Sequence, residues 1–236
     1  MIYNIGLKIS SELPGLWKEG SPYSIKNIYS KKPGKLPPVN YDEHSFKPHS
    51  LTHSESGKHT DNSGLTLDVL IEQYPEYFFG QCLHIAFEKD YRVISENNFL
   101  CEITEVDIDS KIKSLGINKI PGKILISNKN SPVNKFGYHL ENYVFVLDES
   151  GAEYLCNIEK FHLFGTTWKS TDYNPGEYER PIHEKIFQKG IIFELLNLHN
   201  VPEGEYIFSG MPLWLENASE SPCTPILISG DMVNQY

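Results

Sequence analysis

Hydrophobic and polar positions along the chain form short segments that predict more strands than helices. Runs rich in branched and aromatic residues are typical of strands. They lie at residues 2–9, 79–87, 91–94, 123–127, 143–147, 161–164, 191–195, 206–209 and 225–229. Stretches with helical character, several with acidic residues near their start, lie at residues 66–73, 105–115, 149–157 and 181–189. The pattern therefore predicts an α/β fold with strands in the majority.

Two long loops interrupt this pattern. Pro33, Pro37 and Pro38 lie in the segment KKPGKLPPVNY, and a second loop covers residues 128–134. Proline cannot donate a hydrogen bond to a sheet and restricts the residue before it. Neither loop resembles an interdomain linker, and 236 residues is a length that one domain commonly spans. We therefore expect a single domain over residues 1–236.

Composition and charge narrow the classes of function. The 21 Lys+Arg and 31 Asp+Glu give a formal net charge of −10, which repels phosphate backbones and anionic lipids. We therefore expect neither nucleic acid nor a membrane as a partner. The start, MIYNIGLKISSELPG, lacks the apolar run of a secretion signal, which predicts a cytoplasmic protein. The four cysteines form no CxxC pair and are expected to be reduced, mostly buried thiols.

The densest chemical signal is the segment PHSLTHSESGKHTD, which contains His49, His53, Glu55 and His59. In an extended segment, alternation places these four residues on one face. Ser, Thr and Gly disfavour a helix here, so an extended or loop conformation is preferred. Imidazole nitrogen and carboxylate oxygen suit Zn²⁺ or Mn²⁺, and a site with an open position can activate water. The alternative interpretation is a polar, solvated loop.

Four residues in the second half of the chain add to the candidates. Glu194 lies in the apolar strand IIFELL, where a carboxylate is costly unless it is paired or coordinated. His183 opens an amphipathic helix, where a half-exposed structural histidine is the preferred interpretation from the residues alone. Ser170 and Asp172 are interpreted as caps of a turn before the Asn-Pro-Gly loop at 174–176.

The remaining charged candidates are interpreted as structural or solvated. Lys58, Lys169 and Arg180 could meet an anionic substrate, but a solvated surface cation is the preferred interpretation of each. The other histidines, in strand or loop contexts without carboxylates at ligand spacing, are His44, His84, His139, His162 and His199. We expect these five to be structural.

The histidine-rich segment resembles the metal-binding motif of the cyclase family that includes bacterial kynurenine formamidase and isatin hydrolase, H-x-G-T-H-x-D-x-P-x-H. Here it reads H-S-L-T-H-S-E-S-G-K-H. His49, Thr52, His53 and His59 match in register, Glu55 replaces the Asp, and Leu51 and Gly57 replace the Gly and Pro. Glu55 keeps the charge of the family's Asp on an arm that is one methylene longer.

Later segments extend this resemblance over about three quarters of the chain. GTTWKSTD is similar to the family's G-x-D-x-x-S-x-D, with Thr167 in place of the first Asp. PIHEKIFQKGIIFELLNL resembles the stretch that supplies a further His and Glu ligand, at His183 and Glu194, with a spacing one residue shorter. VPEGEYIFSGMPLWLENASESPCTPILI resembles the closing V-P-x-G-x-Y and P-L-x-L…S-P, with Thr224 where an Arg is common.

The resemblance implies a swivelling β/β/α fold with one or two metal ions. It places His49, His53 and Glu55 on one ion, while Glu55, His183 and Glu194 could hold a second. Zn²⁺ is the expected metal and Mn²⁺ the alternative, because His and carboxylate ligands accept both.

His59, the last histidine of the cluster, is the candidate proton carrier, because an imidazole with a pKa near neutrality suits that role. The resemblance also implies a substrate contact for Trp17, in a loose match to W-P-G-D-x-P, and a partner. A homodimer or homotetramer is expected, in which the loop at 31–41 could reach a neighbour's site.

Together these residues predict a metal-dependent hydrolase of a small amide, lactam or ester, acting on linear or cyclic amide C–N bonds through metal-bound hydroxide. Two alternatives stay open. One is a metal-dependent cyclase or dehydratase of a polyketide-like substrate. The other is a non-catalytic, metal-stabilised binding protein, which the departures at Leu51, Glu55, Thr167 and Thr224 motivate. Motifs do not transfer specificity, so the substrate is not identified.

Overall fold

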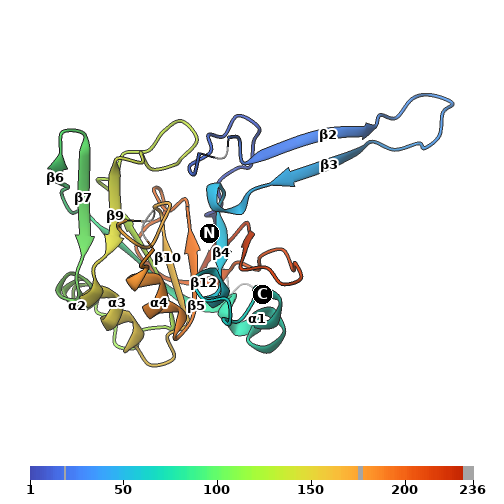
Figure 1. Cartoon of the computed structure of the whole chain (residues 1–236). Coiled ribbons are helices and arrows are strands. Elements are labelled where there is room, and N and C mark those ends of the chain that lie inside the picture. The colour runs from blue at the N-terminus through green and yellow to red at the C-terminus, as the bar shows by residue number, and fades with distance from the viewer. Residues whose placement is uncertain (19, 175–177, 231–236) are drawn as a thin grey trace.

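A sheet of nine strands forms the centre of the computed structural model, which describes residues 1–18, 20–174 and 178–230 (Figure 1). In spatial order the strands are β1 (Ile2–Asn4), β14 (Ile226–Ser229), β12 (Gly204–Ser209), β5 (Phe79–Phe87), β8 (Lys123–Asn128), β10 (Leu163–Thr166), β11 (Ile191–Glu194), β4 (His53–Glu55) and β13 (Glu220–Pro222). The four central strands, β5, β8, β10 and β11, run parallel, and the outer strands pair antiparallel. The carboxyl ends of the parallel strands therefore meet at one edge of the sheet.

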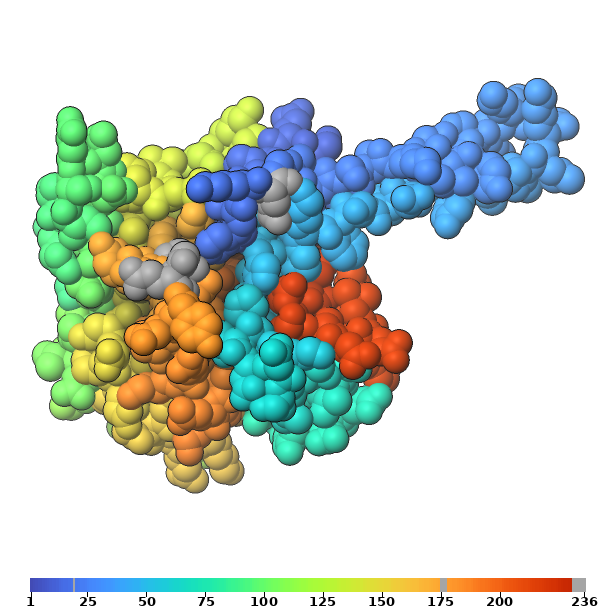
Figure 2. Space-filling model, viewed as in Figure 1, coloured from blue at the N-terminus to red at the C-terminus, as the bar shows by residue number. Residues whose placement is uncertain are grey.

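Two smaller sheets complete the strands. One contains β6 (Arg92–Ser95), β7 (Asn98–Ile103) and β9 (Tyr143–Leu147), in that order. The other is a hairpin of β2 (Tyr23–Tyr29) and β3 (Tyr41–Phe46). This hairpin projects from the body of the molecule as a long arm (Figures 1 and 2).

Four α-helices and three 3₁₀ helices are found in the described residues. The α-helices are α1 (Leu67–Gln73), α2 (Glu105–Ser114), α3 (Glu149–Cys156) and α4 (Pro181–Phe187), and the 3₁₀ helices are η1 (Pro48–Ser50), η2 (Gly57–His59) and η3 (Pro75–Tyr77). A capping box starts α2, because the Thr104 hydroxyl accepts from the Asp107 N–H and the Asp107 carboxylate accepts from the Thr104 N–H. Helices α2, α3 and α4 pack in sequence against one another.

Both faces of the central strands are buried in apolar clusters. On β8, Ile124 and Ile126 pack with side chains of α2, α3 and α4, and Leu125 between them packs with α1 on the opposite face. The same alternation separates Ile192 from Phe193 on β11. Strands buried on both faces have continuous apolar runs rather than alternating ones, which is why these strands are evident in the sequence.

The predicted elements agree with the structure in most places. The α/β class with strands in the majority is confirmed, with fourteen strands among the described residues. The segment 2–9 is extended in the sheet only over β1, because afterwards Ile5 and Leu7 donate to Pro225 and the Thr52 hydroxyl instead. Strand β10 begins two residues later than predicted, at Leu163. The segment 31–41 is the tip of the arm, as the prolines indicated.

Five strands have no predicted counterpart: β2, β3, β4, β7 and β13. The arm strands are largely exposed, so they carry no apolar alternation. Strands β4 and β13 have three residues each, too few for a pattern, and β13 ends in a proline. These two strands are defined only by their pairing with neighbouring strands in the tertiary structure.

The thiols agree with expectation. All four cysteines are free, and Cys156 is the one that is not fully buried. Among the described residues, no helix has the length and apolar character needed to cross a membrane.

Two buried histidines make the stability of this core depend on pH. The His84 ring on β5 donates through Nδ1 to the Pro202 carbonyl at 3.0 Å and accepts through Nε2 from the Ser127 hydroxyl at 2.8 Å. Burial lowers its pKa to about 4, and burial lowers the pKa of His139 to about 3. The unfolded chain therefore binds protons that the folded chain does not, between pH 6.5 and these values.

We predict that the free energy of unfolding falls as the pH is lowered from 7 to 5, with about 2 kcal/mol of the loss from His84. Urea unfolding at several pH values measures this slope. His84→Gln keeps an uncharged polar side chain and should flatten the slope. An equal slope in wild type and His84→Gln would show that His84 does not stay neutral in the folded protein.

Candidate metal centre

Strand β4 lies between β11 and β13 and brings four polar side chains to one face. His53 is opposite Glu194 of β11, and Glu55 is opposite Glu220 of β13. Residues directly opposite in antiparallel strands point to the same face. Alternation also puts His53 and Glu55 on one face of β4, with Ser54 on the other. Register thus places one histidine and three carboxylates together.

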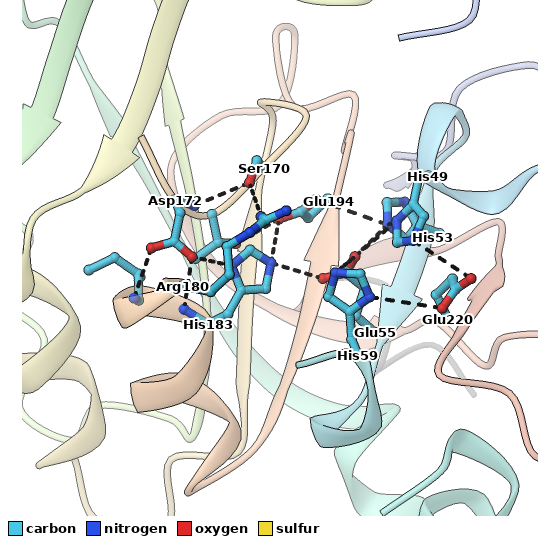
Figure 3. Close-up of polar contacts among 12 residues, drawn as sticks. His49, His53, Glu55, His59, Ser170, Asp172, Arg180, His183, Glu194 and Glu220 are labelled. Carbon is cyan, nitrogen blue, oxygen red and sulfur yellow. Dashed lines mark hydrogen bonds and ion pairs between the residues drawn. The ribbon is translucent and has the colours of Figure 1, made fainter. Parts of the chain in front are cut away.

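Two 3₁₀ helices add the other histidines of the segment. His49 lies in η1 before β4, and His59 ends η2 after it. The segment is therefore extended only at β4, and turns on either side of it fold the outer histidines back. Strict alternation along the whole segment was wrong, but the expected convergence of the four side chains is observed (Figure 3).

The Glu55 carboxylate lies at the centre of the cluster and is only 1% exposed. Its Oε1 atom is 3.1 Å from His53 Nε2, 3.2 Å from His49 Nδ1 and 3.6 Å from His59 Nε2. Its Oε2 atom is 3.2 Å from His183 Nε2. One carboxylate therefore contacts four imidazoles (Figure 3).

His183 and Glu194, distant in sequence, complete the cluster. His183 lies in the first turn of α4, and Glu194 is the last residue of β11, at the carboxyl edge of the parallel strands. Glu194 Oε1 is 3.5 Å from His183 Nε2, and Glu194 Oε2 is 4.0 Å from His53 Nε2. The Thr171 hydroxyl donates to Glu194 Oε1 at 2.9 Å. The structure thus brings all five predicted ligands together.

Hydrogen bonds outside the cluster orient two of the rings. His53 Nδ1 is 2.8 Å from the Leu51 carbonyl, and His183 Nδ1 is 2.5 Å from Asp172 Oδ2. These Nδ1 bonds orient each ring so that Nε2 faces Glu55, and Nε2 is the nitrogen that a bound metal would use. In addition, the Trp17 indole N–H donates to the His49 carbonyl at 3.0 Å.

The contacts of Asp172 differ from its interpretation as a turn cap. Within the part of the chain that the structure describes, its carboxylate makes no hydrogen bond in the turn before the loop at 174–176. Instead it accepts from the N–H groups of Ile182 at 2.9 Å and His183 at 3.3 Å, in the first turn of α4, as well as from the His183 ring. Ser170 does accept from the Asp172 N–H, at 3.3 Å, as a turn cap would. The loop residues 175–177 lie outside the described residues.

The buried charges shift the pKa values in opposite directions. Burial opposes ionisation of Glu55, but hydrogen bonds from His183, His49 and His53 outweigh it and hold the pKa of that carboxyl well below its usual value. Burial opposes protonation of His183, but the contacts with Asp172, Glu194 and Glu55 raise its pKa well above 6.5. The buried carboxylates therefore require positive charge, which a proton on an imidazole or a divalent cation can supply.

The donor set fits a divalent metal. His53, Glu55 and Glu194 each offer a ligand atom, all within 4.8 Å of one another, and so do His49, Glu55 and His59. Both groups contain Glu55, so the longer side chain reaches both sides of the cluster. Imidazole and carboxylate donors of this kind suit Zn²⁺ and Mn²⁺. Which residues share an ion, and whether there are one or two ions, stay predictions.

A pocket of about 190 Å³ opens onto the cluster. Its lining residues are Trp17, His49, Glu55, His59, Ser170, Arg180, His183 and Glu194. Trp17 therefore lies where a substrate contact was expected. His53 is fully buried behind the wall, whereas His59 stays partly exposed.

The sequence analysis did not identify Glu220 as a site residue, and it interpreted Arg180 as a surface cation. Glu220 has carboxylate oxygens 3.6 Å from His49 Nε2 and 4.0 Å from His59 Nδ1. Strand β13 has no hydrophobic pattern that predicts it, so Glu220 was not found from the sequence. Its position directly before the S-P of the closing motif was the only indication. Arg180 is half-buried in the pocket wall rather than a solvated surface cation, and its closeness to His183 in sequence was the available signal.

The structure also shows the surroundings of Lys169, Leu51 and Thr167. Lys169 is not solvated, because its ammonium group bonds Glu141 and lies 4.8 Å from the centre of the Trp17 ring. Leu51, which replaces the family's Gly, is buried in an apolar cluster with Tyr138 and Leu195. The Thr167 hydroxyl is buried and has no hydrogen-bond partner within the part of the chain that is described.

The fold is that of a group of solved metal-dependent hydrolases and cyclases, although no family model and no curated protein matches this chain. One similar structure is a predicted metal-dependent hydrolase from Bacillus stearothermophilus, with 20% identity, a TM-score of 0.68, and coverage of 96% of this chain and 97% of that chain. Isatin hydrolase A from Labrenzia aggregata is 18% identical, with a TM-score of 0.72 and coverage of 97% and 93%. A structure described as a novel cyclase is 11% identical, with a TM-score of 0.72 and coverage of 97% and 88%.

At these identities the likeness shows the fold alone. It confirms the swivelling β/β/α fold expected from the motifs, and it extends over nearly the whole chain, including the middle that the motifs left unmatched. The motifs and the fold therefore point to the same group of proteins.

We predict that Asp172→Asn weakens the affinity for Zn²⁺ or Mn²⁺ by about 10–100-fold, because the His183 ring loses its carboxylate partner. His53→Ala, which removes a ligand, should lose stoichiometric metal altogether. Chelator competition, followed by elemental analysis of the dialysed protein, measures both effects. The exposed Asp90→Asn is the control and should bind metal like wild type. Unchanged affinity in both Asp172→Asn and His53→Ala would contradict a metal centre at this position.

Proposed function

We propose that this protein is a metal-dependent hydrolase of a small amide, lactam or ester, with amide C–N bonds as its preferred target. The observation that carries the proposal is the convergence of five donors beside a small pocket, with His49, His183, Glu55 and Glu194 in its wall and His53 directly behind it. Three imidazoles and two carboxylates would hold the cation. When bound, a divalent cation lowers the pKa of water to about 7 and polarises a carbonyl oxygen.

The placement of these donors favours a catalytic centre over a closed structural one. Glu55, His183 and Glu194 all line the pocket, so a cation that they hold faces the space where a substrate would lie. Structural metal sites are usually closed by four protein ligands away from any pocket. The pocket therefore favours an enzyme over a non-catalytic binding protein.

His59 is placed to move the proton. It lies on the pocket wall, with Nε2 3.6 Å from Glu55 Oε1 and Nδ1 4.0 Å from Glu220 Oε2. Its ring is partly exposed, whereas that of His53 is fully buried. An imidazole in this position can take a proton from the attacking water and pass it to the leaving nitrogen.

A cyclase or dehydratase is the second candidate, because the same fold occurs in a structure described as a novel cyclase. Such a reaction would use the same donors to polarise a carbonyl. The mass of the product separates the candidates, since hydrolysis adds water, dehydration removes it, and simple cyclisation changes nothing.

We predict that metal removal by a chelator abolishes hydrolysis of formanilides, lactams and simple esters, and that added Zn²⁺ or Mn²⁺ restores it. His59→Ala should keep its metal and lose about 10²–10⁴-fold in kcat, because the proton carrier is gone. His162→Ala is the matched control, since His162 directly precedes β10 at the amino edge of the parallel strands, whereas Glu194 ends β11 at their carboxyl edge. Full activity in metal-free protein, or in His59→Ala, would sink the proposal.

We further propose a homodimer or homotetramer in which the arm binds a second copy of the chain. The arm exposes Ile25, Leu36 and Val39. Residues 23–46 also contain four lysines against one Asp and one Glu, whereas the whole chain has a formal net charge of −10. A basic, apolar arm is complementary to the acidic body of an identical chain, and exposed apolar surface of this kind is typical of an interface.

We predict that Leu36→Asp combined with Val39→Asp shifts the protein toward the monomer, because each substitution puts a charge into the buried part of the interface. Light scattering coupled to gel filtration gives the mass directly. Val93→Asp, an equally exposed apolar position on β6, is the control and should leave the mass unchanged. A monomeric wild type would rule out the arm-mediated oligomer.

A further inference from the structure

Arg180 gives the pocket a positive group opposite the metal donors. Among the described residues that line the pocket, it is the only Lys or Arg. It directly precedes α4, three positions before His183, so the helix that supplies a ligand also fixes the arginine. Figure 3 shows its guanidinium beside Ser170, on the side of the cluster away from Glu220.

The Arg180 guanidinium has N–H groups that remain able to bind a ligand. Nη1 donates to the Ser170 hydroxyl at 3.3 Å, and no Asp or Glu oxygen of the described residues lies within 4.0 Å of it. Guanidinium carries five N–H donors in a planar fork that matches a carboxylate. A half-buried cation with one neutral partner is therefore suited to bind an anion that enters the pocket.

The cation in the pocket is an arginine, although almost all other cations of this chain are lysines. Among 21 Lys+Arg, only Arg92 and Arg180 are arginines. Arg92 is exposed on β6, and its guanidinium pairs with Glu102 at 2.7 Å. Lysine thus serves as the cation nearly everywhere else, and the pocket has the residue that binds carboxylates through two parallel hydrogen bonds.

The surroundings restrict the size and charge of the ligand. A volume of about 190 Å³ has room for a compound of one small ring. Trp17 offers an apolar face, and its N–H is already bonded to the His49 carbonyl. Glu55 and Glu194 repel an anion until a cation neutralises them, so Arg180 and the loaded metal donors would attract one molecule from two sides.

We propose that Arg180 binds a carboxylate of the substrate, so that the enzyme acts on small compounds that carry both a hydrolysable carbonyl and a free carboxylate. This inference rests on the proposed hydrolase function and names its substrate class. Arg180 is a specificity-determining residue in this scheme. A cation held by the metal donors would polarise the reacting carbonyl at one end of the pocket, and the arginine fork holds the carboxylate at the other.

The test compares formanilide with its 2-carboxy and 3-carboxy derivatives on wild type, Arg180→Gln and Arg180→Lys. In wild type we expect at least one carboxylated compound to have a kcat/KM about 10–100-fold higher than that of formanilide. Arg180→Gln should bring this ratio close to one, and Arg180→Lys should keep part of it because the charge remains. Arg92→Gln is the matched control and should keep the wild-type ratio.

A binding measurement separates this inference from the hydrolase function. Calorimetry with benzoate and benzamide on the metal-loaded protein should show a preference for benzoate that Arg180→Gln loses and Arg92→Gln keeps. If wild type hydrolyses none of the anilides and none of the lactams and simple esters, the hydrolase proposal fails, and the binding comparison alone decides the role of Arg180. An unchanged benzoate preference in Arg180→Gln overturns the inference. An equal loss of kcat/KM on all three anilides also overturns it, because Arg180 would then act on the reacting carbonyl.

Discussion

The burial of the Glu55 carboxylate is the constraint on which the rest of the site depends. A carboxylate that is 1% exposed must be compensated by hydrogen bonds or positive charge, since an unpaired buried charge costs several kcal/mol. Four imidazoles, one each from η1, β4, η2 and α4, supply that compensation. Their positions in turn fix η1, η2 and the start of α4 around strand β4.

The site is held by the sheet on one side and by α4 on the other. Strand β4 has only three residues, but its pairing with β11 and β13 sets the register that puts Glu194 and Glu220 beside His53 and Glu55. On the other side, Asp172 bonds both the backbone of α4 and the His183 ring, so that one carboxylate positions the helix and its ligand together. A site built on paired strands and a capped helix keeps its donors in place before any ligand binds.

The sequence revealed the elements that are buried on both faces. Strands β5, β8, β9 and β11 are evident because their apolar runs are continuous, and the four helices because of their polar starts. The arm strands, β4 and β13 were not predicted, because exposed or three-residue strands carry no periodic signal. The candidate ligands were found from local density at 49–59 and from an expensive carboxylate at Glu194, with the resemblance adding His183.

The sequence by itself determined the kind of chemistry: imidazoles and carboxylates in a pattern that suits a divalent metal, on an α/β chain of acidic charge. Only the tertiary structure decided which side chains meet. Glu220 and Arg180 belong to the site because strand register and the start of α4 bring them there, and no local pattern encodes either contact. Spacing along a chain reports on neighbours within one element, whereas a binding pocket is assembled from elements whose pairing depends on the whole core.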